Sequence, residues 1–196
     1  MTRNALMVDL ETLATTPDAA ILTLGACMFD PFGGMEQEIP EHEVFLAKAS
    51  IQSNEDAGRR IQAGTLEWWL KQNDTALKAL VSGNITNLRQ LLVKFRLWVD
   101  SETDCRPKTI WANSPSFDMV ILRNAYDQAG EGFTYGFWME RDVRTIGEIA
   151  YPHHQERKAV MKTIRDNTGT HHRADDDAIA QARFVAHCYE KLGIEP

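Results

Sequence analysis

The chain has 196 residues, of which 43% are apolar and 25% charged, and its formal net charge is −7. This length and composition predict one globular domain over residues 1–196. The acidic balance argues against a protein that coats duplex nucleic acid, but it allows an enzyme whose metal-binding cleft takes a strand end. The sequence has no membrane-length apolar run, no signal-peptide core and no CxxC pair among its three cysteines, so we expect a cytoplasmic, reducing environment and no membrane association.

The first apolar run, residues 5–8, leads into Asp9-Leu10-Glu11. We expect a buried strand here, and because side chains alternate along a strand, Asp9 and Glu11 share one face. Two neighbouring carboxylates repel each other, so one of them tends to protonate unless a divalent cation binds both. Oxygen ligands of this kind suit Mg²⁺ or Mn²⁺. On this spacing alone, an edge strand with solvent-facing acids is an equally good interpretation.

The next elements alternate in a way that predicts a mixed sheet. Strands are expected over 21–29 and 43–47, and their short links favour an antiparallel meander with the first strand in the centre. The later elements are a helix over 65–72 capped by Thr65, helices over 74–80 and 87–99, a strand over 109–112, a helix over 117–129 capped by Ser116, a short strand or helix start at 143–146, and a final helix over 174–192. Helices should cover both faces of the sheet, giving an α/β fold. Trp68 or Trp69 could also wall a cleft.

Two further places carry acidic chemistry. Asp118 follows the strand at 109–112 and begins a helix, where it could bind a ligand or only complement the helix dipole. Asp177 precedes Ala178 in the buried stripe of the last helix, so it should point inward and need a partner. His172 lies five residues earlier, and we expect it on the loop that enters this helix, a suitable position for a general base.

A basic stretch leads into the last helix, over residues 153–173. Its cations outnumber its acids, and in an acidic protein such a stretch suggests a grip on phosphate. Lys158 and Arg165 are the candidate contacts. A solvated helix face explains the same pattern equally well.

Four carboxylates and one histidine suffice for two-metal phosphodiester hydrolysis. In that chemistry two cations stabilise the attacking and leaving oxygens, and a histidine with a pKa of about 6.5 accepts the proton of the attacking water.

Three motifs in this order resemble those of the DEDDh 3′-to-5′ exonucleases, the superfamily of ribonuclease T and the proofreading exonucleases. They are VDLET (8–12), NSPSFD (113–118) and HRADDDA (172–178). The resemblance spans nearly the whole chain and implies a ribonuclease H-like α/β fold, with an antiparallel meander followed by parallel strands and flanking helices. The segments TLEWWLKQ and RDVRT are similar to a branch with phage and prophage enzymes, exodeoxyribonuclease VIII and a mycobacterial-type exoribonuclease.

The resemblance assigns roles residue by residue. It implies that two Mg²⁺ or Mn²⁺ ions are held by Asp9, Glu11, Asp118 and Asp177, with His172 as the base. It also implies that Thr12 and Leu13 contact the 3′-terminal nucleotide, and we add Asn113 and Phe117 from the second motif as substrate contacts. Ala112 before Asn113, and Pro115 inside the motif, depart from the common pattern and leave the course of that loop open.

The leading hypothesis is a 3′-to-5′ exonuclease that acts on single-stranded RNA or DNA with a free 3′ end. Because relatives are often homodimers, a homodimer is one expected oligomeric state. Two alternatives stay open. One is a phosphohydrolase of short oligonucleotides. The other is a catalytically silent prophage protein that keeps the fold and binds a partner, against which the complete set of five residues argues.

Overall fold

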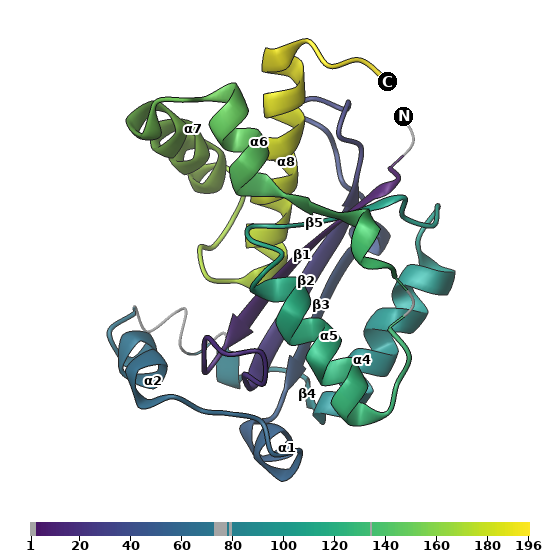
Figure 1. The fold of residues 1–196 in the computed structure, drawn as a ribbon, viewed down its shortest axis with the longest axis vertical. Helices are drawn as coiled ribbons and strands as arrows, with labels where there is room; N and C mark the ends of the chain where they lie inside the picture. Colours follow the sequence, from purple (N-terminus) through teal and green to yellow (C-terminus); the bar gives the residue numbers. More distant parts are fainter. Residues whose placement is uncertain (1–2, 73–77, 79, 134) are drawn as a thin grey trace.

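The computed structural model describes residues 3–72, 78, 80–133 and 135–196. Within them a six-stranded sheet runs in the order β4-β3-β2-β1-β5-β6, with helices on both faces (Figure 1). The strands are β1 (Ala5–Thr12), β2 (Ile21–Phe29), β3 (Val44–Ala49), β4 (Ile85–Thr86), β5 (Thr109–Ala112) and β6 (Glu140–Asp142). β1, β2 and β3 form an antiparallel meander, whereas β5 and β6 add parallel to β1. The predicted meander, the central first strand and the mixed α/β sheet are therefore confirmed.

Seven α-helices flank the sheet in the described part of the chain. The helices are α1 (Ile51–Asp56), α2 (Ala63–Leu70), α4 (Leu88–Leu97), α5 (Asp118–Ala129), α6 (Val143–Ala150), α7 (His154–Asp166) and α8 (Ala174–Leu192). The helix expected over 74–80 falls mostly outside the described residues. The segment at 143–146, which the sequence left open between strand and helix, begins α6, and the Asp142 side chain caps it.

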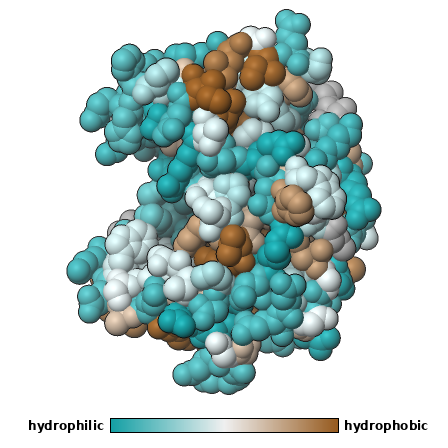
Figure 2. Space-filling model, viewed as in Figure 1, coloured by the Kyte–Doolittle hydropathy of each residue, from teal (hydrophilic) through white to brown (hydrophobic). Residues whose placement is uncertain are grey.

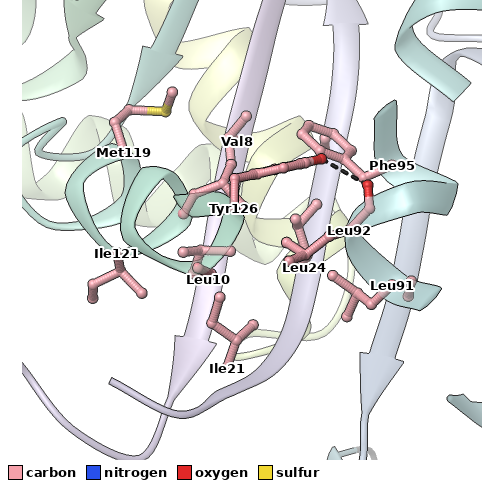
Figure 3. Packing of buried hydrophobic residues seen from close by; sticks show 14 of the residues in the cluster. Val8, Leu10, Ile21, Leu24, Leu91, Leu92, Phe95, Met119, Ile121 and Tyr126 are labelled. Carbon is pink, nitrogen blue, oxygen red and sulfur yellow. Dashed lines mark hydrogen bonds between the residues drawn. The ribbon is translucent and has the colours of Figure 1, made fainter. Parts of the chain in front are cut away.

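The alternation of β1 divides its side chains between two cores. Leu6, Val8 and Leu10 face α4 and α5, where the Tyr126 hydroxyl donates a 2.7 Å hydrogen bond to the Leu92 carbonyl oxygen (Figure 3). Ala5 and Met7 face the other core, with side chains of α6 and α8. Asp9 and Glu11 continue this second face, so the carboxylates follow directly after the buried apolar residues that anchor the strand.

Two helix starts differ from those expected. α5 begins at Asp118, and the Ser116 hydroxyl lies 3.0 Å from the Ser114 hydroxyl instead of capping the helix. α2 begins at Ala63, two residues before Thr65. The Gln62 N–H donates to the Leu13 carbonyl, and the Gln62 side chain accepts from the Thr15 N–H. These bonds tie the start of α2 to the loop after β1, which overrides the capping preference of Thr65.

The first turn of α8 lies directly on the sheet. Gly25 of β2 is the cross-strand partner of Asp9, and a Cβ atom at Gly25 would lie 2.1 Å from the Ala174 carbonyl carbon. The absence of a side chain at this position allows α8 to approach β1 and β2. Ala178, Ala182 and Val185 are then buried, as the predicted stripe requires.

Among the residues that the structure describes, no helix is both long and apolar enough to cross a membrane.

Candidate active site

Four carboxylates converge from three elements beside the central strand. Asp9 and Glu11 come from β1, Asp118 is the first residue of α5, and Asp177 lies in the first turn of α8. Glu11, Asp118 and Asp177 are only 9%, 4% and 7% exposed. Oxygen atoms of Asp9, Glu11 and Asp177 lie within 4.8 Å of one another. This arrangement is a suitable oxygen donor set for a divalent cation.

Asp118 joins the group through the backbone of β1. Its Oδ1 accepts a hydrogen bond of 3.1 Å from the Leu10 N–H. The pairing of β5 with β1 ends at Met7, so the Asp118 carboxylate takes the place of a strand partner further along β1. This bond fixes Asp118 on the edge of β1 that faces β5.

Burial and mutual repulsion perturb the carboxyl groups. Desolvation raises the pKa of Asp9 well above its usual range, and the charges of Asp118 and Asp177 raise it further. The pKa of Glu11 is raised in the same way by burial and then by Asp9, Asp177 and Asp118. Burial raises the pKa of Asp118 to about 7, against hydrogen bonds from the Leu10 N–H and from its own backbone. Four acids crowded in this manner favour protonation or a bound cation.

Gln181 is a neighbour of the acids that the sequence analysis missed. It lies one helical turn after Asp177 and is 2% exposed, and its Nε2 donates a 2.7 Å hydrogen bond to Asp9 Oδ1. Its Oε1 is buried without a hydrogen-bond partner among the described residues. The bond orients the Asp9 carboxylate and favours its ionised form. The spacing of four residues from Asp177 on a helix was the available signal.

His172 lies on the loop before α8, as predicted, with a backbone φ of 65°. Its N–H donates to Asp177 Oδ2 at 2.8 Å, and its Nδ1 lies 4.0 Å from Glu11 Oε1. Burial lowers the pKa of the imidazole, and the neighbouring His171 lowers it further. The neutral form, which can accept a proton, therefore predominates at neutral pH.

Two tryptophans hold the imidazole in place. The His172 ring packs edge-on against Trp68 and Trp69, with ring centroids 5.2 and 5.8 Å apart. Trp69 is itself tied to the end of β1, because its Nε1 donates to the Thr12 carbonyl oxygen. This packing agrees with the expectation that Trp68 or Trp69 forms a wall of the cleft. Their contact with His172 joins positions about 100 residues apart and had no signal in the sequence.

The predicted substrate residues divide between two hollows. Thr12 and Phe117 line the first, of about 400 Å³, together with Glu11, Trp68 and Trp69. Asn113, Lys158 and Arg165 line the second, of about 480 Å³. Figure 2 shows the surface notched on its left side, between α7 above and α2 below.

Leu13 does not line either hollow. Its side chain is buried in a small apolar cluster with Ala20, Leu22, Trp69 and Leu80. It therefore supports the wall formed by Trp69, and any contact of its side chain with a nucleotide would need that cluster to open.

Comparison with solved structures defines the fold. The chain matches Pop2p of S. pombe in a form with Mg²⁺ and Mn²⁺ bound (TM-score 0.61, 12% identity, 96% of this chain and 83% of that one). It also matches the nuclease domain of 3′hExo, a DEDDh family member bound to rAMP (0.57, 12%, 95% and 91%). The third is E. coli ExoI in a complex with single-stranded DNA (0.59, 14%, 96%), of which the chain spans 40%. At these identities the similarity shows the shared ribonuclease H-like fold.

A family model defines the class further. Residues 4–189 match the 3′-5′ exoribonuclease Rv2179c-like domain, and the chain belongs to this family of 3′-5′ exonucleases, which are phosphodiester hydrolases. No curated protein matches the chain in a sequence search. The phage and prophage branch suggested by the sequence stays a prediction.

Proposed function

We propose that residues 1–196 act as one exonuclease domain that removes nucleotides from the 3′ end of single-stranded RNA or DNA. The observation that carries this proposal is the convergence of three buried carboxylates and the half-buried Asp9 with an imidazole 4.0 Å from one of them. The family's description as exoribonucleases supports RNA as the substrate. The 3′-terminal nucleotide would occupy the hollow lined by Thr12, Phe117 and Trp68.

Asp9, Glu11, Asp118 and Asp177 would hold two divalent cations, Mg²⁺ or Mn²⁺. The raised pKa values of Asp9, Glu11 and Asp118 support this fit, because crowded acids are stabilised by positive charge. When bound, such ions supply charge stabilisation for the attacking and leaving oxygens of an in-line displacement. Gln181 would hold the Asp9 carboxylate in the orientation that binding requires.

His172 would accept the proton of the attacking water. Its lowered pKa keeps Nδ1 or Nε2 available as an acceptor at neutral pH. The ring packs against Trp68 and Trp69, and the His172 backbone N–H binds Asp177, so the base is tied to the acids through its own backbone.

We expect divalent ions to stabilise the protein more strongly at high pH. The raised pKa values of Asp9, Glu11 and Asp118 mean that the metal-free folded state holds protons that the unfolded chain has released. The contribution of these three groups to the stability is therefore greatest below their unfolded pKa values of about 4, and it is lost as the pH rises through their raised folded values, which for Asp118 is about 7. Metal ions compete with these protons. At pH 8 and 100 times the Kd, Mn²⁺ should raise the Tm by about 5–10 °C.

Differential scanning fluorimetry at pH 5.5 and pH 8, at constant ionic strength, measures this difference. A smaller rise at pH 5.5 is expected. No rise at either pH would favour the alternative of a silent protein that retains the fold.

Replacing His172 by Asn should lower the rate by about 10²–10⁴-fold at neutral pH. Asn tolerates the positive φ at this position and keeps the backbone N–H that binds Asp177. The metal-induced rise in Tm should persist, and the loss of rate on acidification that follows His172 titration should disappear. His171→Asn is the matched variant, and we expect a much smaller effect from it.

Single-turnover rates between pH 5 and 8 test this role. His171, His172 and Asp177 also offer three ligand atoms within 4.8 Å. Loss of the metal-induced rise in His172→Asn would therefore identify His172 as a ligand, and not as the base.

A further inference from the structure

The larger of the two hollows is a cationic cavity in an acidic protein. It has a volume of about 480 Å³ and lies between α6, α7 and the loops that precede α5 and α8. Arg144, Arg157, Lys158, Lys162 and Arg165 line it. So many cations around one cavity create a local field opposite to the net charge of −7.

Some of these cations have internal partners and others do not. Arg157 pairs with Glu148, and Lys162 pairs with Asp166. Across the described part of the chain, the side chains of Arg144 and Lys158 form no hydrogen bond or ion pair. Both are therefore available to an anionic ligand.

The cavity adjoins the group of acids at Asp177. Arg165 Nε lies 3.9 Å from Asp177 Oδ1, and this buried nitrogen has no hydrogen-bond partner among the described residues. Asn113, on the loop that leads to Asp118, also lines the cavity. A ligand in the cavity would thus be continuous with a phosphate held at the acids, and Glu11 in turn lines the hollow of Thr12 and Trp68.

The lining of the cavity is also partly apolar. Val143, Met161 and Phe184 line it together with the cations. A lining that combines apolar and cationic side chains suits a nucleobase and its flanking phosphates better than an inorganic anion, and the volume lies in the range of small-ligand sites.

We propose that this cavity binds the substrate strand on the 5′ side of the cleaved bond. Resting on the proposed exonuclease function, this places the 3′-terminal nucleotide against Thr12 and Trp68, the cleaved phosphodiester at the four acids, and the next phosphates on Arg144, Lys158 and Arg165. The preferred substrate is then a strand of at least three or four nucleotides. A dinucleotide has no phosphate beyond the one that is cleaved, so it cannot use these cations.

The test is the length dependence of hydrolysis. Single-stranded di-, tri-, tetra- and decanucleotides with 5′-hydroxyl ends are digested with Mn²⁺, and kcat/KM for removal of the first nucleotide is measured by chromatography. For the wild type we expect kcat/KM to rise about 10–100-fold from two to four nucleotides and then to level off. The double variant Arg144→Gln, Lys158→Gln should lose most of this ratio. In the double variant, the slope of log(kcat/KM) against log salt concentration should also become shallower by about 1.4.

Lys94→Gln, on α4, is a charge control that lines a separate open hollow and should keep the wild-type ratio. The proposal is overturned if the wild type cleaves all lengths equally, or if the ratio survives in the double variant with its Tm unchanged. If the wild type cleaves no length with metal present, the proposed function itself fails. The two failures are therefore distinguishable.

Discussion

Replacing Asp9 by Asn should abolish hydrolysis and at the same time stabilise the metal-free protein. Asp9 sits among Glu11, Asp118 and Asp177, and its raised pKa reflects the cost of a fourth negative charge in a buried group. Asn has the same shape and can still accept the hydrogen bond from Gln181. Removing the charge should therefore raise the free energy of unfolding by about 1 kcal/mol or more above neutral pH, which is about 2–4 °C in Tm.

The same change should lower kcat by at least about 10³-fold, because several kcal/mol of charge stabilisation depend on the ligand set. The rise in Tm on adding Mn²⁺ should also be lost. Thermal unfolding with and without Mn²⁺, beside a single-turnover assay, gives all three quantities. If the variant keeps its rate, or if the metal-free protein is less stable than the wild type, the crowding of carboxylates is not the basis of the site.

Replacing Gly25 by Ala should cost both stability and activity, although Gly25 bears no reactive group. The added Cβ would lie 2.1 Å from the Ala174 carbonyl carbon and 2.3 Å from the Asp175 nitrogen, which are backbone atoms of the first two residues of α8. Overpacking against backbone costs about 1–3 kcal/mol or more. The first turn of α8, which carries Asp177, must then move away from β2. A displacement of about 1 Å at a reacting centre can cost about 10²-fold in rate.

Gly132→Ala is the matched control, because a Cβ atom there meets nothing within 4 Å. The free energy of unfolding, measured in urea, and the single-turnover rate should both stay near the wild-type values in the control. Both should fall in Gly25→Ala. Normal activity in Gly25→Ala would show that the contact between α8 and β2 does not set the position of Asp177.

The sequence predicts much of this molecule because its signals are local. The apolar run before Asp9 and the buried stripe of α8 each fix an element within a few residues. The short edge strands β4 and β6 have two and three residues, too few for an alternating pattern, and were missed. The start of α2 was misjudged because its bonds to the loop after β1 are long-range.

The same distinction holds for the candidate site. The three sequence motifs contain five residues that the structure brings together, namely Asp9, Glu11, Asp118, His172 and Asp177. The contact of Trp68 and Trp69 with His172, and that of Arg165 with Asp177, depend on how separate elements pack. No pattern along the chain encodes such contacts. Leu13 shows the converse, since a residue assigned to the substrate by resemblance is buried behind Trp69.

The most direct test of metal-dependent exonuclease activity is digestion of 5′-labelled single-stranded RNA and DNA of one sequence, with Mn²⁺, Mg²⁺ or EDTA, on a denaturing gel. We predict a ladder that shortens from the 3′ end with either metal, is absent with EDTA and is absent in Asp9→Asn, with RNA degraded at least as fast as DNA. Internal fragments, cleavage in EDTA, or intact strands under conditions where Mn²⁺ raises the Tm would contradict it.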